Sequence, residues 1–100
     1  MLQPVNEWMT KSNPILIFGE VKDDKGNPIS EARISFVEGP IPLTDIAALT
    51  DNKGSFVLSA PTTGDYTIEA VSEGLVAKRI RISTGTRHEI RINIELIRVT

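Results

Sequence analysis

His88 is the only histidine in this chain, and histidine is the side chain best suited to metal binding or to proton transfer near neutral pH. A zinc site needs several nitrogen, sulfur or oxygen donors that converge on one point. The chain has no cysteine, and His88 stands beside Glu89 at the start of a predicted strand. We therefore expect His88 to be a surface residue, and we expect no metal site.

Oxygen-bearing side chains gather at two places, Asp23 with Asp24 and Asp51 with Asn52. Clustered oxygen ligands can hold calcium. An aspartate three residues before a glycine is also ordinary turn chemistry, because its carboxylate accepts hydrogen bonds from its own backbone. EF-hand spacing is absent from the sequence, so we expect two turns rather than a calcium site.

Patterns typical of catalytic sites are absent from the sequence. The serines lack a Gly-x-Ser-x-Gly turn, and a chain without cysteine has no thiolate nucleophile. No glycine-rich phosphate loop is present either. We expect no catalytic residue and no cofactor, and hence a protein that is not an enzyme.

Trp8 is the first of four weak candidates for a binding residue. An exposed indole can stack on a sugar ring, and amphipathic aromatic side chains are favoured at interfaces. Alternatively, Trp8 covers an open end of the domain. We favour this second role, because one Trp, one Tyr and three Phe make a thin platform for sugar binding.

Arg79, Arg81 and Arg91 are the other candidates. Alternation along the predicted strands places them outward on neighbouring strands. Outward basic groups attract an anionic ligand or an acidic partner. Cross-strand pairing with Glu69 or Glu95 is the alternative that we favour.

Overall composition limits the classes of partner. A formal net charge of −2 argues against nucleic acid, because phosphate binding needs a basic excess. Apolar runs such as Ile15 to Phe18 are too short for a membrane-spanning helix, and the N-terminus has no secretory signal pattern. We expect a protein or a polysaccharide as the partner, with no direct membrane insertion.

Clusters of glycine and proline divide the chain into short extended segments. Residues 1–14 lack periodicity, so we expect an N-terminal arm or linker before a domain at 15–100. Alternation predicts strands at 15–22, 32–37, 47–50, 55–59, 65–73, 76–82 and 90–96. Gly19, inside the first of these, predicts a bulge or a close backbone neighbour. Seven half-polar strands are typical of an antiparallel β-sandwich.

The same alternation predicts the core and the turns. Phe56, Tyr66 and one face of residues 90–96 point inward, and so does one face of 76–82, with Lys78 as an exception. Residues 51–54 are expected to form a tight hairpin with Gly54 at positive φ, and residues 61–64 to return Tyr66 beneath the same sheet.

The order of these residues resembles the carboxypeptidase regulatory-like domain family. The similarity starts with Gly19-Glu20-Val21-Lys22-Asp23, Gly26 and Pro28-Ile29. It continues with Thr50-Asp51-Asn52-Lys53-Gly54-Ser55-Phe56, Leu58, Ala60-Pro61, Gly64 and Tyr66. The resemblance covers residues 15–96.

That resemblance implies a seven-stranded Greek-key sandwich of the transthyretin-like or prealbumin-like type, within the wider group of Ig-like folds. It also implies a non-catalytic accessory domain that acts as a spacer, a folding aid or a binding platform, in proteins of the cell envelope or outside the cell. Some relatives of this fold bind carbohydrate, so a carbohydrate-binding module is the alternative function. One enzyme related to this fold needs a C-terminal Tyr-Arg-Gly-Ser. This chain ends with Ile97-Arg98-Val99-Thr100, so we do not expect the activity of that enzyme here.

Overall fold

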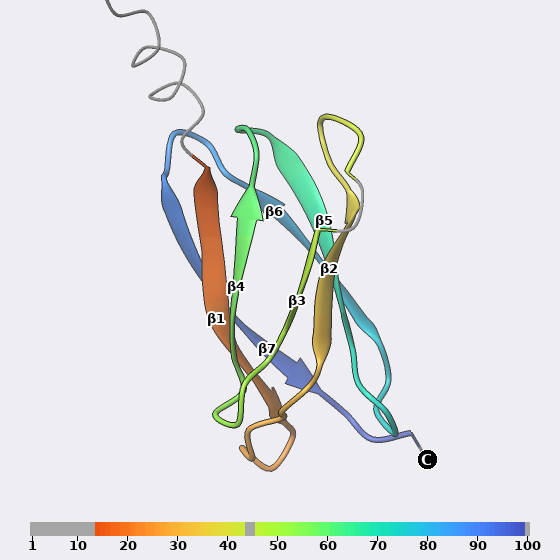
Figure 1. The fold of residues 1–100 in the computed structure, drawn as a ribbon. Helices are drawn as coiled ribbons and strands as arrows, with labels where there is room; N and C mark the ends of the chain where they lie inside the picture. The colour runs from red at the N-terminus through yellow and green to blue at the C-terminus, as the bar shows by residue number, and fades with distance from the viewer. Residues whose placement is uncertain (1–13, 44–45, 100) are drawn as a thin grey trace, which may run out of the picture.

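Two β-sheets pack face to face in the computed structural model, which describes residues 14–43 and 46–99 (Figure 1). The three-stranded sheet has the order β4 (Ser55–Ala60), β1 (Ile15–Asp23), β7 (Glu89–Leu96). The four-stranded sheet has the order β3 (Ala47–Leu49), β2 (Arg33–Glu38), β5 (Asp65–Val71), β6 (Lys78–Ser83). In these residues the chain forms seven strands and no helix, which confirms the predicted all-β sandwich. The predicted arm lies outside the described residues, except for Pro14.

The ladder between β1 and β7 is parallel, with Ile17 opposite Ile90 and Val21 opposite Ile94. The other four ladders among the described strands are antiparallel. The expectation of an antiparallel sandwich is therefore wrong at this pair. The alternation of apolar and polar residues indicates which face of a strand is covered. It is the same in parallel and antiparallel strands, so it could not predict that β1 and β7 are parallel. The Greek-key path stays a prediction.

Gly19 has the close backbone neighbour that its place in β1 predicts. A Cβ atom on Gly19 would lie 1.5 Å from the carbonyl oxygen of Ile92 on β7. Any side chain at this position would push β7 away from β1. Glycine is therefore required here for the parallel pair to form.

The turns before and after β4 carry the chain between the two sheets, so residues 51–54 do not form the predicted hairpin within one sheet. At the first turn, the Thr50 amide donates to the Ala32 carbonyl at 3.0 Å, beside β2. Four residues later, the Gly54 carbonyl accepts from the Val21 amide of β1 at 2.8 Å. Tyr66 likewise follows β4 into the opposite sheet. Turn residues indicate where the chain reverses, but the sheet that it joins depends on long-range pairing.

Gly54 adopts the predicted positive φ, at 78°. A Cβ atom there would also lie 2.5 Å from the Val21 carbonyl oxygen, so both conformation and space require glycine.

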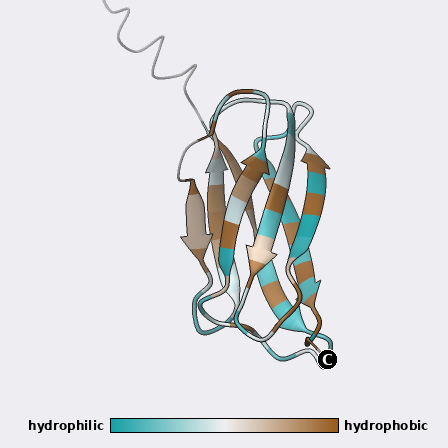
Figure 2. Ribbon diagram, turned by 90° about the vertical axis from the view of Figure 1, so that its right-hand side faces the viewer, coloured by the Kyte–Doolittle hydropathy of each residue, from teal (hydrophilic) through white to brown (hydrophobic). Residues whose placement is uncertain are grey.

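The core lies between the sheets and uses the predicted inward side chains. Among the described residues, fourteen hydrophobic ones are buried: Ile15, Ile17, Val21, Ala32, Ile34, Phe56, Leu58, Ala60, Tyr66, Ile68, Ala70, Ile90, Ile94 and Leu96. Hydrophilic and hydrophobic bands alternate along several strands, as half-covered sheets require (Figure 2). The Tyr66 ring packs against Phe36 at 4.9 Å between centroids, and its hydroxyl donates to the Thr62 carbonyl.

The face predicted for residues 76–82 is correct only in part. Ile80 and Ile82 are half-buried, but β6 begins at Lys78, and Val76 is 44% exposed. The Val76 amide donates to the Ile97 carbonyl at 2.8 Å, outside both sheets. The alternation therefore ends where this segment turns to pair with the residues after β7.

Candidate functional site

The three candidate arginines do not meet. Arg79 and Arg81 lie on β6, whereas Arg91 lies on β7 in the other sheet, so the predicted neighbouring placement is wrong. The favoured pairing is confirmed for Arg79, whose Nε lies 3.2 Å from Oε2 of Glu69 directly across the β5–β6 ladder. Because both side chains are partly exposed, this ion pair contributes only about 0–1 kcal/mol. An anion site shared by the three arginines is not formed.

Arg91 does not pair with Glu95, because the ladder places Glu95 beside Lys22 of β1 and Arg91 beside Phe18. The guanidinium carbon of Arg91 lies 5.8 Å from the centroid of the Phe18 ring, within range of a cation–π interaction. On the other side of β1, Phe18 lies opposite Val57 of β4. Val57, Phe18 and Arg91 thus cross the outer face of the three-stranded sheet in one line, which we call the Phe18 row.

Phe18 was not predicted as a binding residue, although a signal for it exists in the sequence. Residues 15–18 are all apolar. Since successive side chains of a strand point to opposite faces, two of the four must point outward. Ile15 and Ile17 are buried in the core, and Leu16 and Phe18 are the half-buried outward pair.

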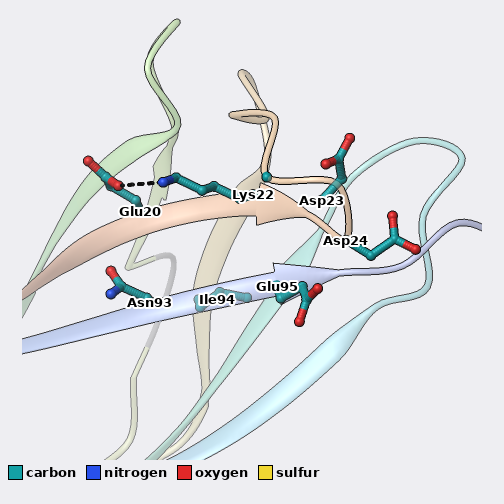
Figure 3. A pocket seen from close by; sticks show the side chains of 8 residues that line it. Glu20, Lys22, Asp23, Asp24, Asn93, Ile94 and Glu95 are labelled. Atoms are coloured by element: carbon teal, nitrogen blue, oxygen red, sulfur yellow. Dashed lines mark ion pairs between the residues drawn. The ribbon is translucent and has the colours of Figure 1, made fainter.

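A shallow hollow of about 300 Å³ lies where β1 meets β7 (Figure 3). Its lining is rich in charged side chains and consists of Glu20, Lys22, Asp23, Asp24, Gly26, Asn93, Ile94 and Glu95. Lys22 is held by Glu20, with 3.7 Å between Nζ and Oε1. Within the described residues, no three His, Cys, Asp or Glu side chains are arranged to hold a metal ion. The described lining of this hollow is therefore charged, but its side chains are not arranged as a metal site.

The two aspartate clusters form the predicted turns. Oδ1 of Asp23 accepts from the amides of Lys25 and Asn27, both at 2.9 Å. Oδ1 of Asp51 accepts from the amides of Lys53 and Ser55, also at 2.9 Å. The Asn27 amide is the main cause that lowers the pKa of Asp23, and the Ser55 amide is the main cause for Asp51. These carboxylates are thus committed to holding turns.

His88 is exposed, as predicted, and borders a shallow hollow with Pro14, Leu16 and Glu89. Its backbone carbonyl accepts from the Leu16 amide at 2.9 Å, so its local role is to begin the β1–β7 ladder. Trp8 lies outside the described residues, and both of its proposed roles stay predictions.

Two buried threonines and one arginine hold the ends of the sandwich. The sequence did not predict this role for any of them, although Thr50 stands in the stretch that carries the family resemblance. Thr50 Oγ1 accepts from the Ala32 amide at 2.9 Å and donates to the Ile29 carbonyl at 2.6 Å. Thr84 Oγ1 accepts from the Gly64 amide at 2.9 Å. Arg87 donates to the carbonyls at the end of β6. No local pattern marks the two threonines, because their hydrogen-bond partners lie 18 to 21 residues away in the sequence.

A family model described as the carboxypeptidase regulatory-like domain matches residues 17–96. The chain belongs to the carboxypeptidase regulatory-like domain family. A comparison with curated protein sequences finds no significant match.

Solved structures with the same fold share little sequence with the chain. A chain of a type II cohesin–X-dockerin complex from Acetivibrio cellulolyticus is similar at a TM-score of 0.64 and 19% identity, over 82% of this chain and 56% of that one. The 3-chlorocatechol 1,2-dioxygenase of Rhodococcus opacus 1CP gives 0.68 and 14%, over 88% and 61%. The Bacillus anthracis TIE protein gives 0.61 and 16%, over 87% and 17%. The chain thus spans less than two thirds of each, and the similarity shows a shared β-sandwich fold.

In the part of the chain that the structure describes, no helix is both long and apolar enough to cross a bilayer.

Proposed function

We propose that this domain is a non-catalytic interaction module that binds a protein partner through the outer face of its three-stranded sheet. The observation that carries the proposal is the Phe18 row, in which Val57, Phe18 and Arg91 lie side by side on three strands. Aromatic residues and arginine are enriched at protein interfaces and supply much of their binding energy. The Phe18 row combines both with an adjacent aliphatic side chain.

The row is not required by the core of the sandwich. Val57 is 57% exposed and points away from the buried residues of its own strand, Phe56 and Leu58. Leu16, two residues before Phe18 on the same outer face, is half-buried and extends the apolar surface. Contiguous apolar side chains on an outer face are typical of interaction sites.

A polysaccharide fits this face less well than a protein does. Sugar binding by stacking needs an open aromatic ring face. The Phe18 ring has Arg91 above it, while Phe56 and Tyr66 are buried and Phe36 packs against Tyr66. The described aromatic residues therefore support recognition of a protein surface rather than stacking on sugar rings.

The structural comparison gives independent support for a protein partner. One chain with this fold is part of a cohesin–X-dockerin complex, which is an assembly of proteins. A domain of this architecture can thus belong to a chain that works by protein association. The expected place at the cell envelope or outside the cell stays a prediction.

Photo-crosslinking tests the proposal. The photoreactive residue p-benzoylphenylalanine is placed at position 91, on the Phe18 row, and at position 81 as a control, since Arg81 is an exposed arginine on the opposite sheet. After irradiation of cells that produce the domain, position 91 is expected to give a discrete adduct with another protein, and position 81 is expected to give none. Equal adducts at both positions, or none at 91 together with saturable binding of a soluble polysaccharide, would contradict the proposal.

A further inference from the structure

The four edge strands of the sandwich differ in how they are protected. Strand β6 carries three charged residues, Lys78, Arg79 and Arg81, and β7 also carries charged residues along its length. Strand β3 is short, with three residues. Strand β4 has six residues without charge or proline, and it pairs with β1 in an unbroken register. Edge strands are usually protected by charge, proline, a bulge or short length. Strand β4 has none of these.

The hydrogen-bond pattern shows which groups of β4 point away from β1. The Gly54 carbonyl accepts from the Val21 amide of β1, so every second residue from Gly54 onward directs its backbone toward β1. The backbone groups of Ser55, Val57 and Ser59 therefore point to the open edge. Ser55 is already used, because its amide donates to Oδ1 of Asp51 and its carbonyl accepts from the Asp51 amide. Val57 and Ser59 remain, without a backbone partner among the described residues.

These two residues are complementary to themselves. If two copies of β4 lie antiparallel with a two-fold axis at Leu58, Val57 of each copy faces Ser59 of the other. Each such pair exchanges two hydrogen bonds, so every open amide and carbonyl of both residues is satisfied. The turn between Asp51 and Ser55 is left intact.

Side chains and charge also fit a second copy. Ser59 is small and exposed, and it leaves room for the exposed Val57 side chain of the other copy. The pairing meets no like-charge repulsion, because β4 carries no charge. Strand β3 lies on the same side of the sandwich as β4 (Figure 1). It contains Leu49, which is 64% exposed.

We propose that β4 is a self-association edge, at which two copies of the domain join their three-stranded sheets into one continuous sheet through Val57 and Ser59. The contact is isologous, so it closes as a dimer and does not grow into a fibre. A stable interface buries at least about 1,000 Å², and an edge contact of this length buries less. We therefore expect a dissociation constant on the order of 0.1–1 mM. This inference does not depend on the proposed partner of the Phe18 row.

Sedimentation equilibrium of the full chain over about 10 µM to 2 mM tests the proposal, since this range spans the expected dissociation constant. The weight-average mass is expected to rise from 11.0 kDa toward twice that value. Val57→Lys should keep the protein monomeric, because it places two ammonium groups near the two-fold axis. Val76→Lys is the matched control, since Val76 is also exposed but lies outside β4, and it should associate like the wild type.

Ser59→Pro is a second variant that separates association from folding. Its missing amide is one that the monomer leaves unpaired, so thermal unfolding should change little while association weakens at least tenfold. The proposal is overturned if the wild type stays monomeric over the whole range, or if Val57→Lys and Val76→Lys associate equally. It is also overturned if Ser59→Pro associates as strongly as the wild type.

Discussion

Thr50 gives the sharpest test of how the end of the sandwich is held. Thr50 is only 3% exposed. Its hydroxyl accepts a hydrogen bond from the Ala32 amide and donates one to the Ile29 carbonyl. Thr50→Val keeps the shape of the side chain and removes both hydrogen bonds. Ala32 is fully buried, so its amide loses its partner without access to water, whereas Ile29 is half-buried and its carbonyl can be hydrated.

The expected loss follows from these two environments. An unsatisfied buried amide costs about 1–3 kcal/mol, and a hydrogen bond whose carbonyl returns to water about 0.5–1.5 kcal/mol. We therefore expect Thr50→Val to lower the free energy of unfolding by about 2–4 kcal/mol. In a domain of this size, that corresponds to a decrease in Tm of at least about 8 °C.

Urea unfolding followed by circular dichroism measures this loss, and Thr67→Val is the matched control. Thr67 is also buried, but its hydroxyl donates to the carboxylate of Glu38, which is exposed and can be hydrated. Thr67→Val should cost about 1 kcal/mol or less. If Thr50→Val costs no more than Thr67→Val, the hydroxyl of Thr50 does not hold this end of the sandwich.

The remaining predictions concern the core, the glycine turns and pH. Phe56→Ala should lower the free energy of unfolding by about 3–5 kcal/mol in urea titrations, since Phe56 is 3% exposed. Gly54→Ala should destabilise more than Gly26→Ala in thermal melts, because both glycines have positive φ but only at Gly54 would a Cβ atom meet backbone, 2.5 Å from an oxygen. The lowered pKa values of Asp23 and Asp51 imply stability that is present above pH 3.8 and lost as pH falls through the folded-state values, as measured by urea midpoints.

Each of these predictions has a clear contrary result. A loss below about 1 kcal/mol for Phe56→Ala would place this ring outside the core. Equal melting temperatures for the two glycine variants would mean that Gly54 has no close backbone neighbour. The double variant Asp23→Asn, Asp51→Asn should show a weaker decline of stability below pH 4, and an unchanged decline would assign the pH dependence to other carboxylates.

The sequence predicted the seven strands and the inward side chains well, because both depend on a local period of two. Phe56, Tyr66 and Gly54 illustrate this, since each lies where the alternation or the turn chemistry places it. The parallel pairing of β1 with β7 was not predictable in this way. These strands lie at opposite ends of the chain, and their direction is fixed by the path of everything between them.

The candidate site was less predictable than the fold for the same reason. Arg79 and Arg91 look similar in sequence, since each precedes an isoleucine in a segment where polar and apolar residues alternate, but the topology places them on opposite sheets. Arg79 contacts Glu69 and Arg91 contacts Phe18 because of the order of the strands in each sheet. Local sequence patterns carry no information about that order. The exposed edge of β4 likewise becomes visible only when the partners of every strand are known.

Mapping of the binding surface tests the central claim most directly. The protein captured through position 91 is added to the isotopically labelled domain, and backbone amide shifts are recorded by nuclear magnetic resonance. We expect the largest changes at Leu16, Phe18, Val57 and Arg91 on the outer face of the three-stranded sheet. Changes centred on β6, or on the hollow beside Asp24, with the Phe18 row unaffected, would contradict the claim.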